Sequence, residues 1–123
     1  MYLLAVITGG GCGALVRFMI ANYFNNTSFP LGTLIANAIA ALLAGICYVL
    51  IVEHYKLPIA KNLLIIGFLG ALSTLSALSL ETFIMFENGK LLLAAAYLAL
   101  SNIIAIVSTF ISIYATRYLI GFI

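Results

Sequence analysis

The feature that most constrains this chain is a run of small and polar residues inside a hydrophobic segment long enough to cross a bilayer. The segment covers about residues 62–86, and residues 67–82 within it read GFLGALSTLSALSLET. Serine and threonine hydroxyls can bond to nearby backbone groups and weaken a regular helix, and glycine frees the backbone to bend. In lipid, an irregular backbone persists only where it is buried in protein or lines a wet cavity. The run therefore predicts a membrane helix that is broken near its middle and forms a site there.

Three further hydrophobic segments complete the chain, over about residues 3–23, 32–52 and 91–118. Each satisfies the requirement of about 20 mostly apolar residues for a spanning helix. Of the 123 residues, 66% are hydrophobic and 7% are charged, which leaves no room for a soluble domain beside the membrane part. The sequence predicts an all-α membrane protein, with one domain of four transmembrane helices over residues 1–123. Four spans place both termini on the same side of the membrane.

Most of the charged residues lie in the connections, which we expect at residues 24–31, 53–61 and 87–90. The side that holds the termini carries Lys56, Lys61 and Arg117, whereas the other side carries Lys90. Arg17 lies within the first span, nearer the second side. This small bias favours cytoplasmic termini by the positive-inside rule, and it leaves insertion in both orientations open. The positive charges are scattered rather than clustered, so they do not indicate a nucleic-acid partner.

Two polar residues within the first two spans stand out among small residues. Arg17, the one cation away from the ends of the predicted spans, costs at least about 2.5 kcal/mol in the hydrocarbon core. It either snorkels to the nearby polar turn or lines a vestibule that attracts an anion. On the second helix, Thr33 and Asn37 share a face with alanines. Asn37 either joins two helices or, with Thr33, supplies uncharged donors that replace the water shell of an anion without trapping it.

The fourth helix and the end of the third carry further polar residues. Ser101, Ser108 and Ser112 share one face of the fourth helix, which indicates either a wet pathway or hydroxyls bonded to their own backbone. Glu81, the only acid inside a span, is either a structural anchor for backbone freed by the break or a proton or cation site.

The remaining reactive side chains do not indicate catalysis. Cys12 and Cys47 lie in apolar segments, where we expect reduced packing residues, and His54 lies in a loop where we expect it to be solvated. The sequence contains no pairing of a nucleophile with a base, no phosphate-binding loop and no cluster of metal ligands. We therefore expect no enzyme activity.

Three segments resemble the helix motifs of one family of membrane proteins. Residues 10–17, GGCGALVR, resemble the G-x-x-G-A-x-x-R of its first helix. Residues 29–37, FPLGTLIAN, resemble the F-P-x-G-T-x-x-x-N that begins its second helix. Residues 67–81, GFLGALSTLSALSLE, resemble the third-helix pattern G-F-x-G-G-x-T-T-F-S-T-F-S-x-E. The order of the three motifs and the chain length also agree, so the chain resembles the CrcB/Fluc fluoride channels over nearly its whole length.

The resemblance implies a dual-topology protein of the cell membrane, a prokaryotic inner membrane, that assembles as an antiparallel dimer. Two fluoride pores then run along the interface, and a structural sodium ion lies at the dimer centre. The motifs assign the sodium-binding carbonyl groups to Gly70 and Ser73, the vestibule arginine to Arg17 and the pore amide to Asn37, with Thr33 and the Ser108 face as further candidates for a polar track.

The chain departs from the family at two positions that matter for the pore. The family pattern has two phenylalanines whose ring edges face the permeating fluoride, and here these positions are Leu75 and Leu78. An aromatic edge is electropositive and can meet an anion, whereas leucine has no such edge. Ala71, Ser73 and Ala77 also replace the family residues. The chain either pairs with a related, phenylalanine-bearing subunit or forms a homodimer with an altered or lost pore.

The expected function is that of a channel subunit through which cytoplasmic fluoride leaves passively, relieving fluoride toxicity. Hydrofluoric acid crosses lipid as a neutral molecule and ionises inside the cell, so a pore lets the anion leave down its gradient. One alternative is a proton-coupled exporter like the small multidrug-resistance proteins, which carry an acid in the first helix where this chain has Arg17. Another is a poorly conducting partner subunit of a heterodimeric channel.

Overall fold

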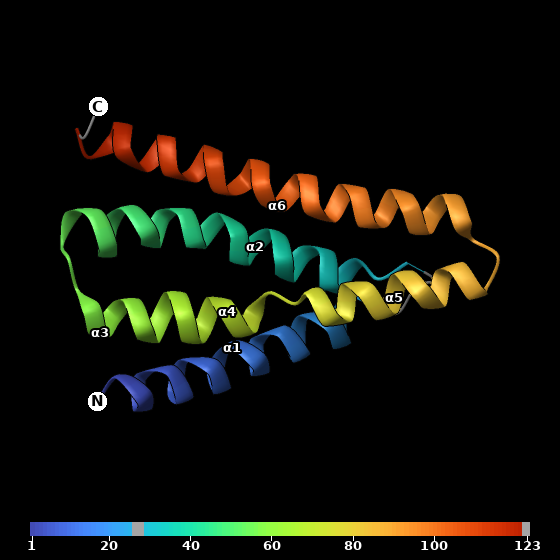
Figure 1. Cartoon of the computed structure of the whole chain (residues 1–123), viewed down its shortest axis with the longest axis horizontal. Coiled ribbons are helices and arrows are strands. Elements are labelled where there is room, and N and C mark those ends of the chain that lie inside the picture. The colour runs from blue at the N-terminus through green and yellow to red at the C-terminus, as the bar shows by residue number, and fades with distance from the viewer. Residues whose placement is uncertain (26–28, 122–123) are drawn as a thin grey trace.

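The computed structural model describes residues 1–25 and 29–121 as a bundle of helices (Figure 1). Within these residues, four helical runs are long and apolar enough to cross a membrane: Tyr2–Phe24, Leu31–His54, Pro58–Glu87 and Leu91–Leu119. The predicted all-α class and the four hydrophobic helices are confirmed, and the chain is a multi-pass membrane protein. Part of the turn predicted at residues 24–31, including Asn26 and Ser28, lies outside the described residues.

The runs are built from α-helical and wider π-helical turns. The first run is α1, Tyr2–Phe24, and the second joins α2, Leu31–Cys47, to the π-helix η1, Tyr48–His54. The third begins with α3, Pro58–Ala60, the π-helix η2, Lys61–Leu69, and α4, Gly70–Leu72, and it ends with α5, Leu75–Glu87. The fourth run is α6, Leu91–Leu119.

Two residues with extended backbone, Ser73 and Thr74, separate α4 from α5. Their φ and ψ angles are −77° and 151° for Ser73, and −151° and 120° for Thr74. The Thr74 hydroxyl accepts a hydrogen bond from the Ala77 N–H at 3.2 Å, so Thr74 is the N-cap of α5. This cap provides a local reason for helical hydrogen bonding to resume at Leu75.

The connection between the second and third runs is shorter than the predicted loop at residues 53–61. Glu53 and His54 belong to η1, and helix resumes at Pro58, whose fixed φ suits a first helical turn. The His54 ring meets the Tyr55 ring edge to face, with 4.5 Å between centroids. Glu53 forms an ion pair with Arg117 of α6, which fastens the end of the second run to the end of the fourth.

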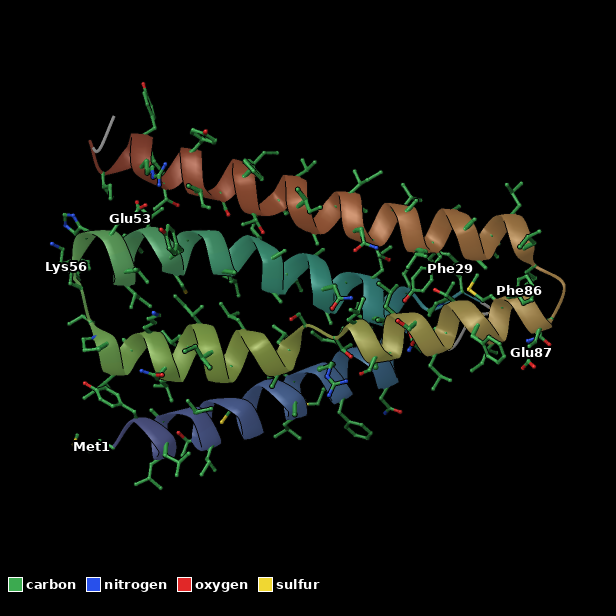
Figure 2. The ribbon with its side chains drawn as sticks, viewed as in Figure 1. Met1, Phe29, Glu53, Lys56, Phe86 and Glu87 are labelled. Atoms are coloured by element: carbon green, nitrogen blue, oxygen red, sulfur yellow. The ribbon has the colours of Figure 1, made fainter. Side chains whose placement is uncertain are left out.

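The two ends of the bundle carry different parts of the chain. Figure 2 shows Met1, Glu53 and Lys56 at one end, with Phe86 and Glu87 at the opposite end. The last turns of α6 lie at the same end as the start of α1 (Figure 1). At the far end, Gly89 has a φ of +73°, which allows the tight turn between α5 and α6 without strain.

Glycine allows α1 to pack directly on the backbone of η2. A Cβ atom added at Gly9 would lie 2.0 Å from the Leu63 carbonyl oxygen, and one added at Gly13 would lie 2.1 Å from the Phe68 carbonyl oxygen. Both glycines are buried. Small residues drive association in lipid because they let helices come this close. These glycines of the first helix therefore form a packing face.

The two halves of the third run pack into separate hydrophobic clusters. Before Ser73, Leu69 and Leu72 pack with alanines of α2 in one cluster. After Thr74, Leu78 and Met85 pack with Ala94 and Tyr97 of α6 in the other. The extended residues lie between the two clusters, so each half of the run has its own anchor.

Candidate functional site

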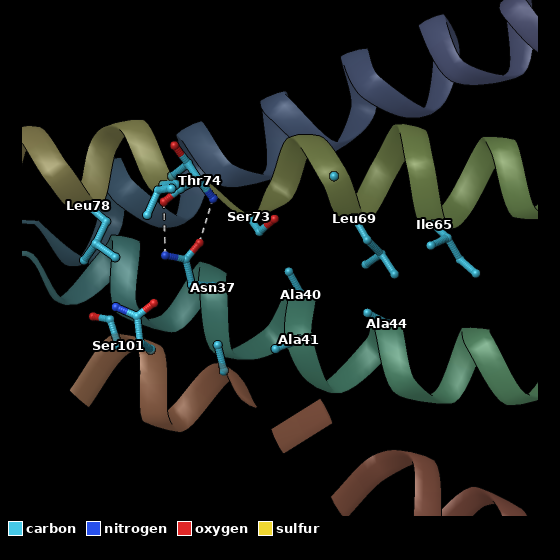
Figure 3. Close-up of a pocket in the computed structure, with 14 residues that line it drawn as sticks. Asn37, Ala40, Ala41, Ala44, Ile65, Leu69, Ser73, Thr74, Leu78 and Ser101 are labelled. Carbon is cyan, nitrogen blue, oxygen red and sulfur yellow. Dashed lines mark hydrogen bonds between the residues drawn. The ribbon is translucent and has the colours of Figure 1, made fainter. Parts of the chain in front are cut away.

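Asn37 of α2 binds both backbone groups of Thr74 (Figure 3). The Thr74 N–H donates to Asn37 Oδ1 at 2.7 Å, and Asn37 Nδ2 donates to the Thr74 carbonyl oxygen at 3.3 Å. Asn37 is 9% exposed, so its amide meets these groups in a mostly buried setting. The pair of bonds fixes the orientation of the amide and leaves one N–H of Nδ2 for another acceptor.

The same bonds release two carbonyl groups of the third run. In a continuous α-helix the Gly70 carbonyl accepts from the Thr74 N–H, and the Ser73 carbonyl accepts from the Ala77 N–H. Here the Thr74 N–H donates to Asn37, and the Ala77 N–H donates to the Thr74 hydroxyl. Gly70 and Ser73 thus lose their usual donors, which leaves carbonyl oxygens of the kind that a hard cation such as sodium takes as ligands.

Arg17 reaches the third run from α1. Its Nε donates to the Ala71 carbonyl oxygen at 3.0 Å, and the side chain is half-buried. Arg17 therefore does not simply extend to the membrane surface, because its guanidinium is fixed against a helix end within the bundle. Neither terminal nitrogen has a hydrogen-bond partner among residues 1–25 and 29–121, so both can bind a further acceptor.

An open cavity of about 370 Å³ lies beside the extended residues (Figure 3). Asn37, Ser73, Thr74, Leu75, Leu78 and Ser101 are among the residues that line it. The Ser101 hydroxyl oxygen is buried and has no hydrogen-bond partner among the described residues. An unpaired buried hydroxyl is costly, so Ser101 places a hydroxyl in need of a partner in the wall of the cavity.

A second cavity, of about 220 Å³, lies on the α1 side of the extended residues. Arg17, Thr33 and Glu81 line it, and Thr74 lines both cavities. The second cavity is more polar in character than the first, because it holds a guanidinium and a carboxylate. The short stretch around Thr74 therefore lies between two cavities with different chemistry.

Glu81 connects three of the four helical runs. One carboxylate oxygen accepts from the Thr33 hydroxyl at 2.7 Å, and the other accepts from the Tyr97 hydroxyl at 2.6 Å. Thr33 and Tyr97 are buried, at 3% and 0% exposure. Each oxygen of the carboxylate thus has a short bond to a side chain of a neighbouring helix, which makes Glu81 an anchor between α2, α5 and α6.

The two leucines at the family's phenylalanine positions line the same cavity but differ in exposure. Leu75 is 68% exposed, whereas Leu78 is 3% exposed within the cluster that includes Tyr97. The sequence spacing predicted that both leucines lie on one face, whereas in the structure Leu75 lies at the surface of the chain and Leu78 in its core.

The polar residues of α6 also divide into different roles. Ser101 lines the larger cavity, and Ser108 is half-buried but is not among the residues that line it. The Ser112 hydroxyl donates to the Thr109 carbonyl at 3.0 Å, and Thr109 donates to Ala41 of α2 at 3.1 Å. Ser112 thus bonds to the backbone of its own helix, and Thr109, which is not part of the predicted serine face, joins α6 to α2.

Sequence reasoning gave no role to Thr74, Ala71 or Tyr97. The Thr74 carbonyl accepts a hydrogen bond from Asn37, and the Ala71 carbonyl accepts one from Arg17. The Tyr97 hydroxyl donates to Glu81. The polar side chains that make these contacts were visible in the sequence. Their partners were not, since two are backbone carbonyls and the third is a tyrosine in an apolar helix.

Known proteins resemble this chain over almost its full length. A family described as CrcB-like protein, Camphor Resistance (CrcB), matches residues 4–113. A protein of Hahella chejuensis is 34% identical over 123 residues, with 97% of each chain covered. A protein of Nitratiruptor sp. is 38% identical over 120 residues, which cover 95% of this chain and 93% of the relative. A protein of Pseudomonas fluorescens is 37% identical over 119 residues, covering 94% of this chain and 96% of the relative.

All three relatives carry the name "Fluoride-specific ion channel FluC". The matched region includes all three motifs, from the glycines of α1 to Glu81 in α5. With the match spanning the four hydrophobic helices and the residues around Thr74, the chain belongs to the CrcB-like protein family.

Proposed function

We propose that this chain is a subunit of a passive, fluoride-selective ion channel of the cell membrane, and not an enzyme. The observation that carries the proposal is the Asn37 amide, bound at Thr74 with one N–H left over and facing the larger cavity. The names of the relatives point to the same ion. Such a pore lets fluoride leave the cytoplasm down its gradient.

The donors at the larger cavity suit a small, strongly hydrated anion. Asn37 and Ser101 offer N–H and O–H groups without full charge. Conduction needs binding that replaces the water shell and yet releases the ion, and uncharged donors meet both requirements. Arg17 lies in the neighbouring cavity, where its positive charge attracts anions without being in the narrow path.

The protomer also presents polar groups where a lipid-facing surface has none. Ser73, Ser76 and Asn102 are exposed, although they lie at the middle of spanning runs. Polar groups and irregular backbone at membrane depth need protein or water around them. An antiparallel dimer supplies that cover, with either a second copy or a related subunit.

The released carbonyls of Gly70 and Ser73 support a structural sodium ion in that dimer. Each protomer brings its pair of oxygens, and two protomers together form a larger set of hard ligands. The residues fit the ion because both oxygens have lost their helical donors to Asn37 and Thr74. A bound cation would supply positive charge to the carbonyl oxygens of Gly70 and Ser73, which would hold it.

Fluoride efflux from liposomes tests the function. We expect the purified chain to release fluoride faster than protein-free liposomes do, to exclude chloride, and to need no proton gradient. Asn37→Ala removes one donor to the anion and both bonds to Thr74, so we expect efflux to fall at least about tenfold. Asn22→Ala, at an exposed asparagine of α1, is the matched control and should leave efflux unchanged.

Two results would contradict the proposal. The first is efflux indistinguishable from protein-free liposomes, both for the unmodified chain and for a variant with phenylalanine introduced at Leu75. The second is flux that requires a pH gradient, which would favour a proton-coupled exporter. Unchanged efflux in Asn37→Ala would limit Asn37 to joining α2 with the third run.

A further inference from the structure

We propose that Arg17 is a positioning residue that holds the end of α4 at Ala71, and so determines which carbonyl groups around Thr74 stay open to a cation. The proposal rests on the proposed function, since it concerns the cation site that function includes. It adds a role in building that site to the vestibule role that the resemblance implies for Arg17.

The first step concerns the carbonyls that lose their helical donors. The Thr74 N–H donates to Asn37 in place of the Gly70 carbonyl. The Ala77 N–H donates to the Thr74 hydroxyl in place of the Ser73 carbonyl. The Ala71 carbonyl lies between these two along the chain, and Arg17 Nε binds it at 3.0 Å. Arg17 thus occupies the Ala71 carbonyl and leaves the carbonyls of Gly70 and Ser73 without a bond from its Nε.

The second step concerns charge at the helix end. The helix that begins at Pro58 ends at Leu72, and its last carbonyls carry the negative end of the helix dipole. A cation there is favourable, and a hydrogen bond from a guanidinium to a carbonyl is stronger than one between neutral groups. Arg17 therefore stabilises this end as part of the chain itself, before any ion is bound.

The third step concerns rigidity. Arg17, on α1, binds the backbone of Ala71, and Asn37, on α2, binds the backbone of Thr74. The backbone between these two points is short and passes from the last turn of α4 into the extended residues Ser73 and Thr74, so two different helices fix it from two sides. A metal site with few ligands per protomer requires carbonyl groups in fixed positions, because mobile ligands lower the affinity of the site for the cation.

Hydrogen–deuterium exchange tests this role without measuring transport. The purified protein in lipid nanodiscs is compared in sodium buffer and in N-methylglucamine buffer, without fluoride. We expect Arg17→Met to speed exchange of the amides at residues 73–77 at least about tenfold, since it loses a charge-assisted bond. Arg17→Lys keeps the charge and a donor, so it should restore most of the protection. Asn22→Met, on the same helix, should change nothing.

The exchange data separate a failure of the Arg17 role from a failure of the proposed cation site. Exchange at residues 73–77 that is unchanged in Arg17→Met overturns the proposal. If Arg17→Met does not assemble, Arg17→Gln retains an N–H donor without the charge, and exchange equal to that of the unmodified chain overturns the proposal there too. A rise in exchange along α6 as well as at residues 73–77 marks general unfolding and also counts against a local role. Exchange in the unmodified chain that does not respond to sodium contradicts the proposed cation, and leaves the Arg17 comparison intact.

Discussion

At the scale of single residues, the polar side chains of this protein act mainly on backbone groups and on one another. Asn37 and Arg17 bind the third run, and Glu81 binds the hydroxyls of Thr33 and Tyr97. Each side chain would be costly in lipid without a partner, because nothing there replaces the lost water. Their partners therefore explain why a chain that is 7% charged keeps these residues inside its spans.

Glu81 gives a direct test of a structural acid. We expect Glu81→Gln to lower the melting temperature in detergent, with a loss of about 1–3 kcal/mol, because the amide keeps one acceptor oxygen and replaces the other with an NH2 group, which cannot accept from a hydroxyl. Tyr97→Phe removes one of those donors, so the two changes should be non-additive by about 0.5–3 kcal/mol in a double-mutant cycle. Glu87→Gln, at an exposed acid of the same helix, is the control and should stay within about 0.5 kcal/mol. A Glu81→Gln protein as stable as the unmodified chain would argue for a proton site instead.

At the scale of elements, the third run depends on its neighbours on both sides of Thr74. Its first half lies against α1 and α2, and its second half lies against α6. Each half packs in its own hydrophobic cluster, so the stability of the fold does not depend on the extended residues between them. This division lets the backbone at Ser73 and Thr74 serve a site while the helices around it stay packed.

The packing of α1 on η2 predicts a sharp contrast between neighbouring glycines. Gly13→Ala would place a Cβ 2.1 Å from the Phe68 carbonyl oxygen, and Gly9→Ala would place one 2.0 Å from the Leu63 carbonyl oxygen. We expect each to cost at least about 2 kcal/mol, since the contact is with backbone that cannot rotate away. Gly11→Ala meets nothing within 4 Å and should be neutral or slightly stabilising, because alanine favours helix. Melting temperatures in detergent compare the three, and equal values would show that α1 and η2 are less closely packed.

Which of these elements could be predicted depended on whether the signal was local. The four hydrophobic runs and the shared face of Thr33 and Asn37 follow from composition and spacing, so the sequence was enough for them. The π-helical turns of η1 and η2 have no such signal, and the predicted loop at residues 53–61 was too long for that reason. The contact between Arg17 and Ala71 joins residues 54 apart in the sequence. Every residue has a backbone carbonyl, so nothing in the sequence indicates that Arg17 binds the one at Ala71.

At the scale of the whole molecule, the positive charges at the two ends of the bundle bias the orientation in the membrane only weakly. The end with Met1 and Lys56 also holds Arg117, which is paired with Glu53 (Figure 2). Positive charge near the spans remains only slightly larger on that side, so we expect no strong preference for one orientation. An antiparallel dimer needs both orientations, or this chain in one and a related subunit in the other.

Labelling from outside the cell tests this arrangement. In a background without Cys12 and Cys47, single cysteines replace Tyr55 at one end or Asn88 at the other, and both positions are exposed. We expect an impermeant maleimide to label roughly half of the copies at each position, as small charge biases give mixed insertion. Labelling of Asn88→Cys alone, in cells without a related subunit, would rule out the antiparallel dimer.

The leucines at positions 75 and 78 set the expected conductance of an assembly made from this chain alone. Both line the larger cavity, and leucine offers fluoride only aliphatic C–H groups. Removing water from so strongly hydrated an anion against such a surface is costly, and a leucine-lined constriction can also lose its water. We therefore expect slow fluoride efflux from liposomes that hold this chain alone. A robust pore should need rings from a phenylalanine-bearing partner.

Restoring the rings one at a time separates conduction from packing. Leu75 is 68% exposed, so Leu75→Phe should fit and should raise efflux by offering an electropositive ring edge. Leu78 is 3% exposed beside Met85 and Tyr97, so Leu78→Phe should cost about 1–3 kcal/mol of stability as well. Leu80→Phe is the matched control, since Leu80 is 60% exposed on the same helix and does not line the cavity. Fast efflux from the unmodified chain, or an equal gain from Leu75→Phe and Leu80→Phe, would show that fluoride does not depend on rings at these positions.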